Sequence, residues 1–177
     1  MLITVSGPPG SGTTTASRGV AHDLAVELLP GGEVFRAMAA EHDMTLAAFG
    51  AYAKVHPEVD VELDTRLAAR ARKGDVVIES RLAGWIVRND CLAAVSVWID
   101  CDERVRAARV AEREGIGVEQ ALDDNAVRHR VERDRYLALY DIDLADLSVY
   151  DLVLDSGALS ADEVAERIVT TARSRPW

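Results

Sequence analysis

Nine residues near the start of the chain form a pattern that binds phosphate. Gly7 to Thr15 read GPPGSGTTT, and Gly7 and Gly12 are spaced as in the phosphate-binding loop Gly-x-x-x-x-Gly-Lys-Ser/Thr. Thr13 stands where that pattern has its lysine, and Thr14 holds the hydroxyl position that contacts magnesium. Glycines let several backbone N–H groups converge on an anion, and the following helix adds the positive end of its dipole. The loop is therefore predicted to bind phosphate without its usual cation.

The position of this loop favours a nucleotide site. A glycine- and proline-rich turn without any ligand is the alternative explanation. The loop, however, lies between the apolar run Leu2 to Val5 and a helical run from Thr14 to Leu24, which is the order that the phosphate site needs. The residues expected to bind ATP are Gly7, Pro8, Pro9, Gly10, Ser11, Gly12, Thr13, Thr14 and Thr15.

A second charged group ends a predicted strand, in the sequence Asp75-Val-Val-Ile-Glu-Ser-Arg81. The carboxyl ends of parallel strands meet at one edge of a sheet, so Glu79 and Arg81 are expected to share a crevice with the phosphate loop. Glu79 could orient Mg²⁺ through its water ligands, with Thr14 as the other metal contact, and Arg81 could clamp a second phosphate. The alternative is a surface ion pair.

Arginines are dense from residue 103 to residue 135, where eight of them balance eight acidic residues. One predicted helix carries Arg106, Arg109 and Arg113 on a shared face, and Arg128 and Arg135 share a face of the next. Of these, Arg109, Arg113, Arg128 and Arg135 are expected to bind phosphate, because the planar guanidinium can pair with two phosphate oxygens at once.

The Gly115-Ile-Gly117 sequence between the two helices predicts a hinge, and hence a mobile lid over residues 109–135. The alternative is a pair of solvated helices held by ion pairs four residues apart, such as Asp102 with Arg106. That explanation is preferred for three further arginines of this segment, Arg104, Arg130 and Arg133.

The elements that position these groups alternate between short apolar strands and helices. Nearly uninterrupted apolar strands are buried on both faces, which indicates a parallel sheet wrapped by helices. We therefore expect an α/β fold of three layers, with a central parallel sheet flanked by helices. The predicted strands are 2–6, 76–79, 95–99 and 152–154, and the predicted helices are 14–24, 34–41, 59–72, 104–114, 120–139 and 161–173.

Local signals refine this assignment at three places. Asp102 is placed to cap the helix that follows it, and Ser160 with Glu163 forms a capping box. The helical stretch 45–73, inserted between two strands, is predicted to form a small mobile subdomain.

Length and composition fit one domain over residues 1–177, with 49% hydrophobic residues to form a core. No run approaches the roughly 20 apolar residues of a membrane span, and no leader pattern precedes the first strand, so we expect a soluble cytoplasmic protein. We also expect it to be a monomer. Cys91 and Cys101 lack metal-ligand spacing and the four histidines are scattered. Free thiols are expected, and a histidine metal site is not.

The charge balance restricts the partners. Twenty Lys and Arg against 30 Asp and Glu give a net charge of -10, which disfavours nucleic acid and anionic membranes as partners. Small anions in a local basic pocket remain compatible. Only Lys54 and Lys73 are lysines, and a general compositional bias explains the arginine excess as a whole.

Six short sequence segments, taken together in chain order, form a further pattern. They are GPPGSGTTT, Gly32-Glu-Val-Phe-Arg36 followed by Met38-Ala39, Phe49 through Pro57-Glu58-Val-Asp60, Glu79-Ser-Arg81-Leu-Ala-Gly-Trp85, Arg135-Tyr136 leading to Tyr140-Asp-Ile-Asp143, and Tyr150-Asp-Leu-Val-Leu-Asp-Ser156. In order and spacing they resemble the nucleoside monophosphate kinases, and most closely the cytidylate kinases of the compact archaeal type. The resemblance covers nearly the whole chain.

This resemblance implies a P-loop kinase fold with an acceptor-binding insertion at about 31–73 and a lid at about 109–135. It implies transfer of the γ-phosphoryl group of ATP to CMP, and to dCMP, with Mg²⁺ as cofactor. Arg36, Arg81 and Gly32 would bind the acceptor, and Asp155 would bind ATP near the donor base. The catalytic arginines would be Arg81, Arg109, Arg113, Arg128 and Arg135.

Two positions depart from the wider family. Thr13 replaces the lysine, although the archaeal cytidylate kinases often read Gly-Thr-Thr-Thr here. Gly31 replaces a serine that contacts the acceptor base in the bacterial enzymes. Those enzymes also have an inserted acceptor subdomain, for which this chain is too short.

The chemistry of such an acceptor needs no general base. The second pKa of a phosphate monoester is near 6, so the attacking oxygen is already ionised at neutral pH. Catalysis then consists of alignment in line and neutralisation of the moving group by Mg²⁺ and arginines.

Other functions stay open on the residues alone. A kinase of another small metabolite, such as shikimate or dephospho-coenzyme A, and an adenylate kinase share these features. A nucleotide-binding sensor that lost catalysis with its lysine is an alternative of a different class. A structural or interaction protein explains neither the loop nor the arginine faces.

Overall fold

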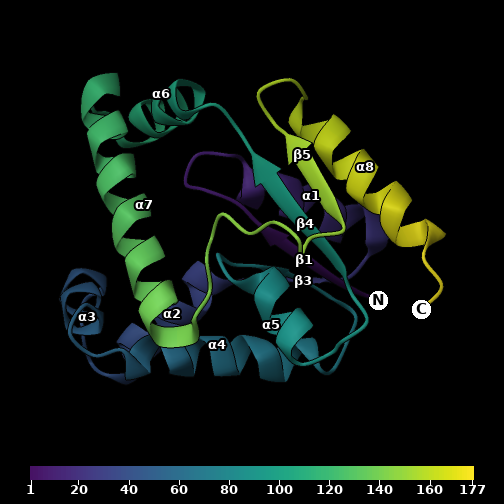
Figure 1. Cartoon of the computed structure of the whole chain (residues 1–177), viewed down its shortest axis with the longest axis horizontal. Helices are drawn as coiled ribbons and strands as arrows, with labels where there is room; N and C mark the ends of the chain where they lie inside the picture. The colour runs from purple at the N-terminus through teal and green to yellow at the C-terminus, as the bar shows by residue number, and fades with distance from the viewer.

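The computed structural model describes residues 1–177 and has a sheet of five parallel strands at its centre (Figure 1). The strands lie in the order β2-β3-β1-β4-β5. Their bounds are β1 Leu2–Ser6, β2 Glu27–Pro30, β3 Val76–Glu79, β4 Val95–Asp100 and β5 Leu152–Asp155. The chain leaves the central β1 first toward β3 and β2 and later toward β4 and β5, which makes the end of β1 the point where a crevice opens.

The alternation of side chains along β1 assigns each face of the sheet to a pair of helices. Ile3 and Val5 belong to a core shared with α1 (Thr13–Leu24) and α8 (Ala161–Ser174). Leu2 points to the opposite face and packs with α4 (Glu58–Ala71) and α5 (Ala83–Asn89). This is the three-layer α/β arrangement that the apolar strands predicted.

Four further helices lie beyond these layers. α2 (Gly31–Glu41) and α3 (Leu46–Ala53) share a small core around the fully buried Met38 and Phe49. α6 (Glu103–Glu114) and α7 (Val118–Tyr140) share another, and α7 runs from α6 toward α2 and α4 (Figure 1). Gly115 ends α6 at φ +68°, a conformation that glycine adopts without strain, and the chain then turns into α7.

Most predicted elements are confirmed. All four predicted strands and all six predicted helices are present, with ends that differ by three residues or fewer. Asp102 caps α6 through its side chain, and the capping box of Ser160 and Glu163 begins α8.

The prediction missed β2 and α5 as separate elements. β2 is a four-residue edge strand that begins at Glu27 and ends at Pro30, so it lacks the apolar run that marked the other strands. α5 has only seven residues, too few for a clear helical period. α3 lies within the stretch 45–73 that was predicted to be helical.

The structure also shows the state of the cysteines, the arrangement of potential metal ligands and the character of the helices. Cys91 is exposed and Cys101 is buried, and both are free thiols. No cluster of three or more His, Cys, Asp and Glu residues is arranged to hold a metal ion. None of the helices combines the length and the apolar character needed to cross a bilayer.

Candidate active site

One open cleft of about 1120 Å³ lies over the carboxyl ends of the strands. Its walls come from the loop after β1, from α2, α3 and α4, from the end of β3, and from α6 and α7. Most of the predicted site residues line it. They are Gly7, Pro8, Pro9, Gly10, Gly12, Thr13, Thr14, Thr15, Gly32, Arg36, Glu79, Arg81, Arg109, Arg113, Arg128 and Arg135.

The phosphate loop ends in a helix start that has no protein cap. Gly12 precedes α1 at φ +88° and offers no side chain to the first N–H groups of the helix. These groups are free for an anion, and the helix dipole favours one there. Gly10, at φ +81°, lies so close to α6 that a Cβ would be 2.6 Å from the Arg106 carbonyl oxygen. The glycines are therefore required by backbone geometry.

Thr13, Thr14 and Glu79 form a cluster of oxygen atoms beside the loop. The Thr13 and Thr14 hydroxyls donate to the same oxygen of Glu79, Oε1, at 2.8 and 3.1 Å. Hydroxyl and carboxylate oxygens are the ligands that Mg²⁺ prefers, and Mg²⁺ usually takes one or two protein ligands together with substrate phosphates and water. The residues present thus fit the predicted magnesium contacts.

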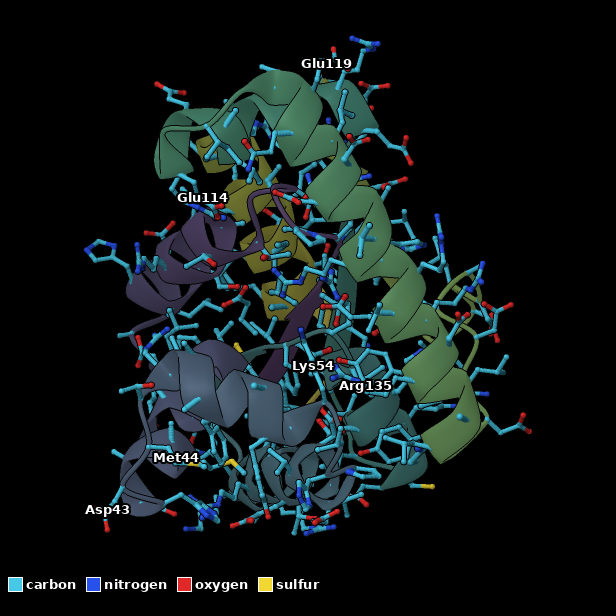
Figure 2. All side chains as sticks on the ribbon, turned by 90° about the vertical axis from the view of Figure 1, so that its left-hand side faces the viewer. Asp43, Met44, Lys54, Glu114, Glu119 and Arg135 are labelled. Carbon is cyan, nitrogen blue, oxygen red and sulfur yellow. The ribbon has the colours of Figure 1, made fainter.

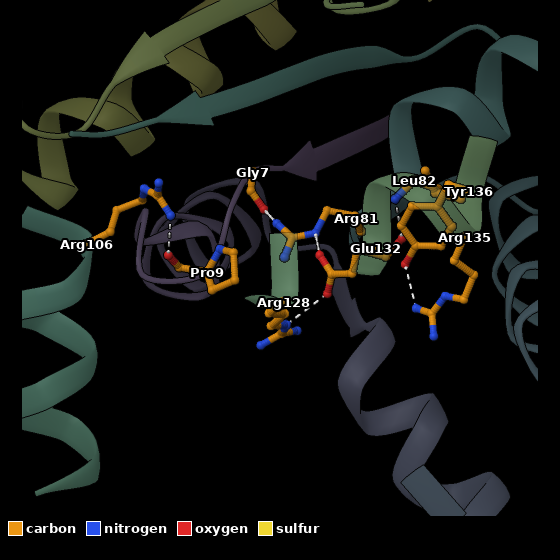
Figure 3. Close-up of polar contacts among 10 residues, drawn as sticks. Gly7, Pro9, Arg81, Leu82, Arg106, Arg128, Glu132, Arg135 and Tyr136 are labelled. Carbon is orange, nitrogen blue, oxygen red and sulfur yellow. Dashed lines mark hydrogen bonds and ion pairs between the residues drawn. The ribbon is translucent and has the colours of Figure 1, made fainter. Parts of the chain in front are cut away.

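Glu132 joins two of the predicted catalytic arginines (Figure 3). Its carboxylate lies 2.8 Å from Arg81 Nε and 2.8 Å from Arg128 Nε, one oxygen to each. Arg81 also donates to the carbonyl oxygen of Gly7, so it connects the end of β3 to the phosphate loop. The Arg81 and Glu132 side chains are only 12% and 10% exposed, which weakens solvent screening of this pair.

Arg109 lies at the junction of the large cleft with a smaller cavity of about 220 Å³. It donates to Ser156 Oγ at 3.0 Å and to the Ser156 carbonyl oxygen at 2.8 Å. Ser11 and Ser156 line the small cavity, whereas Asp155 lines neither and instead accepts from the Gly157 N–H at 2.7 Å. The predicted donor-base segment is present, with Ser156 rather than Asp155 facing the space.

Arg36 and Arg113 reach the cleft from its rim. Arg36 is 58% exposed and lies 4.0 Å from Glu33, and Arg113 is 64% exposed and pairs with Glu114 at 2.7 Å. Neither has a partner that would hold it inside the cleft in this state. Their predicted roles require a change of side-chain position.

Arg106 has a structural role. It is buried, donates to the carbonyl oxygens of Cys101 at 3.0 Å and Pro9 at 3.3 Å, and so fastens α6 to the loop (Figure 3). The Asp102–Arg106 ion pair, given as an example of the alternative explanation, does not form, because the Asp102 side chain caps the N–H groups of Arg104 and Val105. Arg106 Nη2 lies 3.9 Å from Glu103 instead.

Two aspartates of α4 were missed as site residues. Asp60 and Asp64 lie one helical turn apart and both line the cleft. Asp64 accepts from the Tyr140 hydroxyl at 2.8 Å, and Asp60 Oδ2 lies 3.3 Å from Arg135 Nε. Their i, i+4 spacing on a predicted helix was the available signal, since it places both on one face.

Burial alters the acidity of this pair. It raises the pKa of Asp64 to about 6, with Asp60 adding to the effect and Tyr140 and Arg135 opposing it. Burial also raises the pKa of Asp60, although the positive charge of the nearby Arg135 acts to lower it. Lys54, at the end of α3, also lines this part of the cleft together with Arg135 (Figure 2). Its position could not be read from the sequence.

The fold and the site together define a P-loop phosphotransferase, with an anion-binding helix start and several arginines around one cleft. The family model described as AAA domain matches residues 3–134. The structure is similar to a shikimate kinase from Acinetobacter baumannii, with TM-score 0.64, 16% identity and coverage of 98% of this chain and 93% of that one. That likeness concerns the fold.

Sequence relatives narrow the class. The chain is 48% identical to a cytidylate kinase from Pyrococcus horikoshii and 49% identical to one from Pyrococcus furiosus. Each match spans 164 residues, which is 93% of this chain and 84% of the relative. The chain belongs to the cytidylate kinase family.

Asp64 should make folding stability depend on pH. Its pKa is about 6 in the folded protein against 3.8 for an ordinary Asp, so the folded state binds more protons than the unfolded state between these values. The favourable contribution is complete below pH 4 and is lost as the pH rises through 6. Relative to Asp64→Asn, the wild type should lose on the order of 3 kcal/mol of unfolding free energy across that interval.

Urea unfolding of both proteins at pH 4, 5, 6 and 7 measures this difference. Asparagine can still accept from Tyr140 through its amide oxygen, so that hydrogen bond is not the variable. Parallel stability curves for the two proteins would show that Asp64 has an ordinary pKa.

Proposed function

We propose that this protein transfers the γ-phosphoryl group of ATP to CMP, giving ADP and CDP, and that it also accepts dCMP. The observation that carries this proposal is a single cleft in which an anion-binding loop faces arginines from four other elements, in a chain 49% identical to a cytidylate kinase. Adenylate kinases and kinases of other small metabolites are not favoured by these relatives.

ATP would occupy the end of the cleft formed by the loop. The uncapped N–H groups at the start of α1 would bind its phosphates, and Thr14 with Glu79 would hold the magnesium. When bound, Mg²⁺ supplies positive charge to the phosphate oxygens. The small cavity beside Arg109 and Ser156 has room for the donor base, and Ser11 of the loop forms part of its wall.

The acceptor would occupy the end of the cleft between α2, α4 and α7. Arg81 and Arg36, with Gly32, would bind its phosphate, and the insertion at about 31–73 would enclose the nucleoside. Because the phosphate is already dianionic near neutral pH, no residue need take a proton from it. Arg81 contacts both Gly7 and Glu132, which supports a position between the two substrates.

The arginines would supply the charge that the loop lacks. Arg109 lies beside the loop, its Nη1 3.4 Å from the Gly10 carbonyl oxygen, and Arg113 and Arg128 lie further along the predicted lid of residues 109–135. Closure of the lid about Gly115 would bring these side chains onto the transferring group and exclude water. We further propose that the protein acts as a monomer in the cytoplasm.

A direct assay tests the proposal. Purified protein is supplied with ATP, Mg²⁺ and CMP, dCMP, UMP or AMP in turn, and formation of the corresponding diphosphate is measured. CMP and dCMP should give the highest kcat/KM. A better rate with AMP would make the protein an adenylate kinase, and ATP binding without transfer to any acceptor would make it a nucleotide-binding protein without this activity.

Arg81→Ala should separate the two substrates. Loss of a positioned arginine should lower kcat/KM for CMP by on the order of 10³, while the Kd for Mg·ATP changes far less. Arg104→Ala is the matched control, because Arg104 is 75% exposed and pairs with Glu119 outside the cleft. Equal losses for both substrates would remove Arg81 from the acceptor site.

A double substitution tests whether Arg109 supplies the positive charge that a loop lysine would otherwise provide. Arg109→Ala should weaken Mg·ATP binding roughly tenfold, because a charge-assisted contact is lost. Adding Thr13→Lys should restore most of that affinity, since it returns an ammonium to the usual position of the loop. Calorimetric titration gives each Kd. If Thr13→Lys alone abolishes ATP binding, the loop does not bind phosphate in the manner described.

A further inference from the structure

The acceptor end of the cleft holds polar atoms that no protein partner satisfies. Asp60 Oδ2 and Arg135 Nε are both buried without a hydrogen bond, although the two atoms lie only 3.3 Å apart. Unsatisfied buried polar atoms are costly, and a cleft wall is a place where a ligand can compensate for them. These atoms belong to α4 and α7, which converge at this end of the cleft (Figure 1).

Asp64, the neighbouring carboxylate, does have a hydrogen-bond partner within the protein. Asp64 accepts a hydrogen bond from the Tyr140 hydroxyl at 2.8 Å, so part of its accepting capacity is already used. Asp60 is the deeper of the two residues, with its side chain 9% exposed, yet it lines the cleft. Of the two aspartates, Asp60 is thus the one with acceptor capacity left for a ligand.

The surroundings suit a flat heterocycle. Phe35 of α2 lines the cleft, and its ring packs against Phe49 with the centroids 4.9 Å apart. Leu63 of α4 and Val131 of α7 also line this space. An aromatic ring with apolar neighbours can pack against the plane of a base, so that polar groups at the edge determine which base is bound.

A carboxylate can distinguish cytosine from uracil by the hydrogen-bonding groups at the edge of each base. An ionised carboxylate can only accept hydrogen bonds. Burial raises the pKa of Asp60, and Arg135 beside it opposes that rise, since a nearby positive charge favours the ionised form. Cytosine presents its N4 amino group as a donor, whereas position 4 of uracil carries a carbonyl oxygen that also only accepts. The carboxylate would therefore attract cytosine and repel uracil.

We propose that the carboxylate of Asp60 determines the choice of acceptor base by accepting a hydrogen bond from the 4-amino group of cytosine. Arg135 holds the carboxylate in place, and Phe35 contacts the plane of the ring. This inference rests on the proposed function, because it concerns the acceptor of that reaction. Adenine also has an exocyclic amino group, so the contact separates CMP from UMP, and the size of the pocket must exclude AMP.

The first test compares acceptors in Asp60→Asn. The asparagine amide can present either its oxygen or its NH₂ group, so it fits cytosine and uracil alike. The ratio of kcat/KM for CMP to that for UMP should fall roughly 10- to 100-fold, because a specific contact to a base edge is lost. Thermal unfolding and the Kd for Mg·ATP, measured alongside, should remain close to the wild-type values.

Two variants of the same helix serve as controls. Glu62→Gln removes one negative charge from the outer face of α4, where Glu62 lies 2.6 Å from Arg66, and should keep the wild-type ratio. Asp64→Asn should also keep it, since Asp64 is already bound to Tyr140. If Asp64→Asn lowers the ratio and Asp60→Asn does not, the assignment to Asp60 is wrong.

A second test removes the amino group from the ligand. The wild type should bind CMP about 10- to 100-fold more tightly than the 5′-monophosphate of pyrimidin-2-one riboside, which lacks the 4-amino group. Asp60→Asn should bind the two with a ratio at least tenfold smaller. An unchanged ratio in the variant would overturn the inference while leaving the proposed reaction intact, whereas a wild type that phosphorylates neither CMP nor UMP would overturn the proposed function itself.

Discussion

The site depends on a single buried carboxylate that holds two guanidinium groups in one place. Glu132 of α7 binds Arg81 from the end of β3 and Arg128 from one turn earlier on α7, and Arg81 continues to the carbonyl oxygen of Gly7. Without that carboxylate the two cations would repel each other across a poorly solvated cleft. With it, α7, the sheet and the phosphate loop share one network, so that a movement of α7 also alters the surroundings of the substrates.

The distribution of charge follows from a loop that has no lysine of its own. A lysine within the loop stays beside the phosphates at all times. Here the cations beside the loop belong to other elements: Arg81, after β3, donates to the Gly7 carbonyl oxygen, and Arg109 of α6 donates to that of Gly10. Arg128 of α7 lines the same cleft and is 60% exposed. The positive potential at the loop therefore varies with the position of these helices. In the proposed reaction, this would link binding of the triphosphate to closure of the lid, and the full charge would act only in the state that excludes water.

The two ends of the cleft differ in chemistry although they form one space. The end at the loop has free backbone N–H groups, hydroxyls and arginines, which suit phosphates. The end between α4 and α7 has the buried carboxylate of Asp60, the half-buried carboxylate of Asp64, an arginine and an aromatic ring, which suit the edge and plane of a base. Arg81 lies between them. A protein with a net charge of -10 can thus bind highly charged anions, because the local charge around the cleft differs from the overall balance.

The sequence by itself determined four of the five strands, the main helices, two of their caps and the phosphate loop, because these depend on local periodicity, on side chains that cap helix ends, and on glycine conformations. It also placed Arg81 and Glu79 at the loop, since parallel strands end at the same edge. Only the tertiary structure decided that Arg106 supports the loop while Arg109 faces the cleft, that Ser156 rather than Asp155 faces the small cavity, and that Asp60, Asp64 and Lys54 join the site. Those outcomes depend on how helices pack against one another, and the side-chain directions that result from packing are not encoded in the spacing of any one segment.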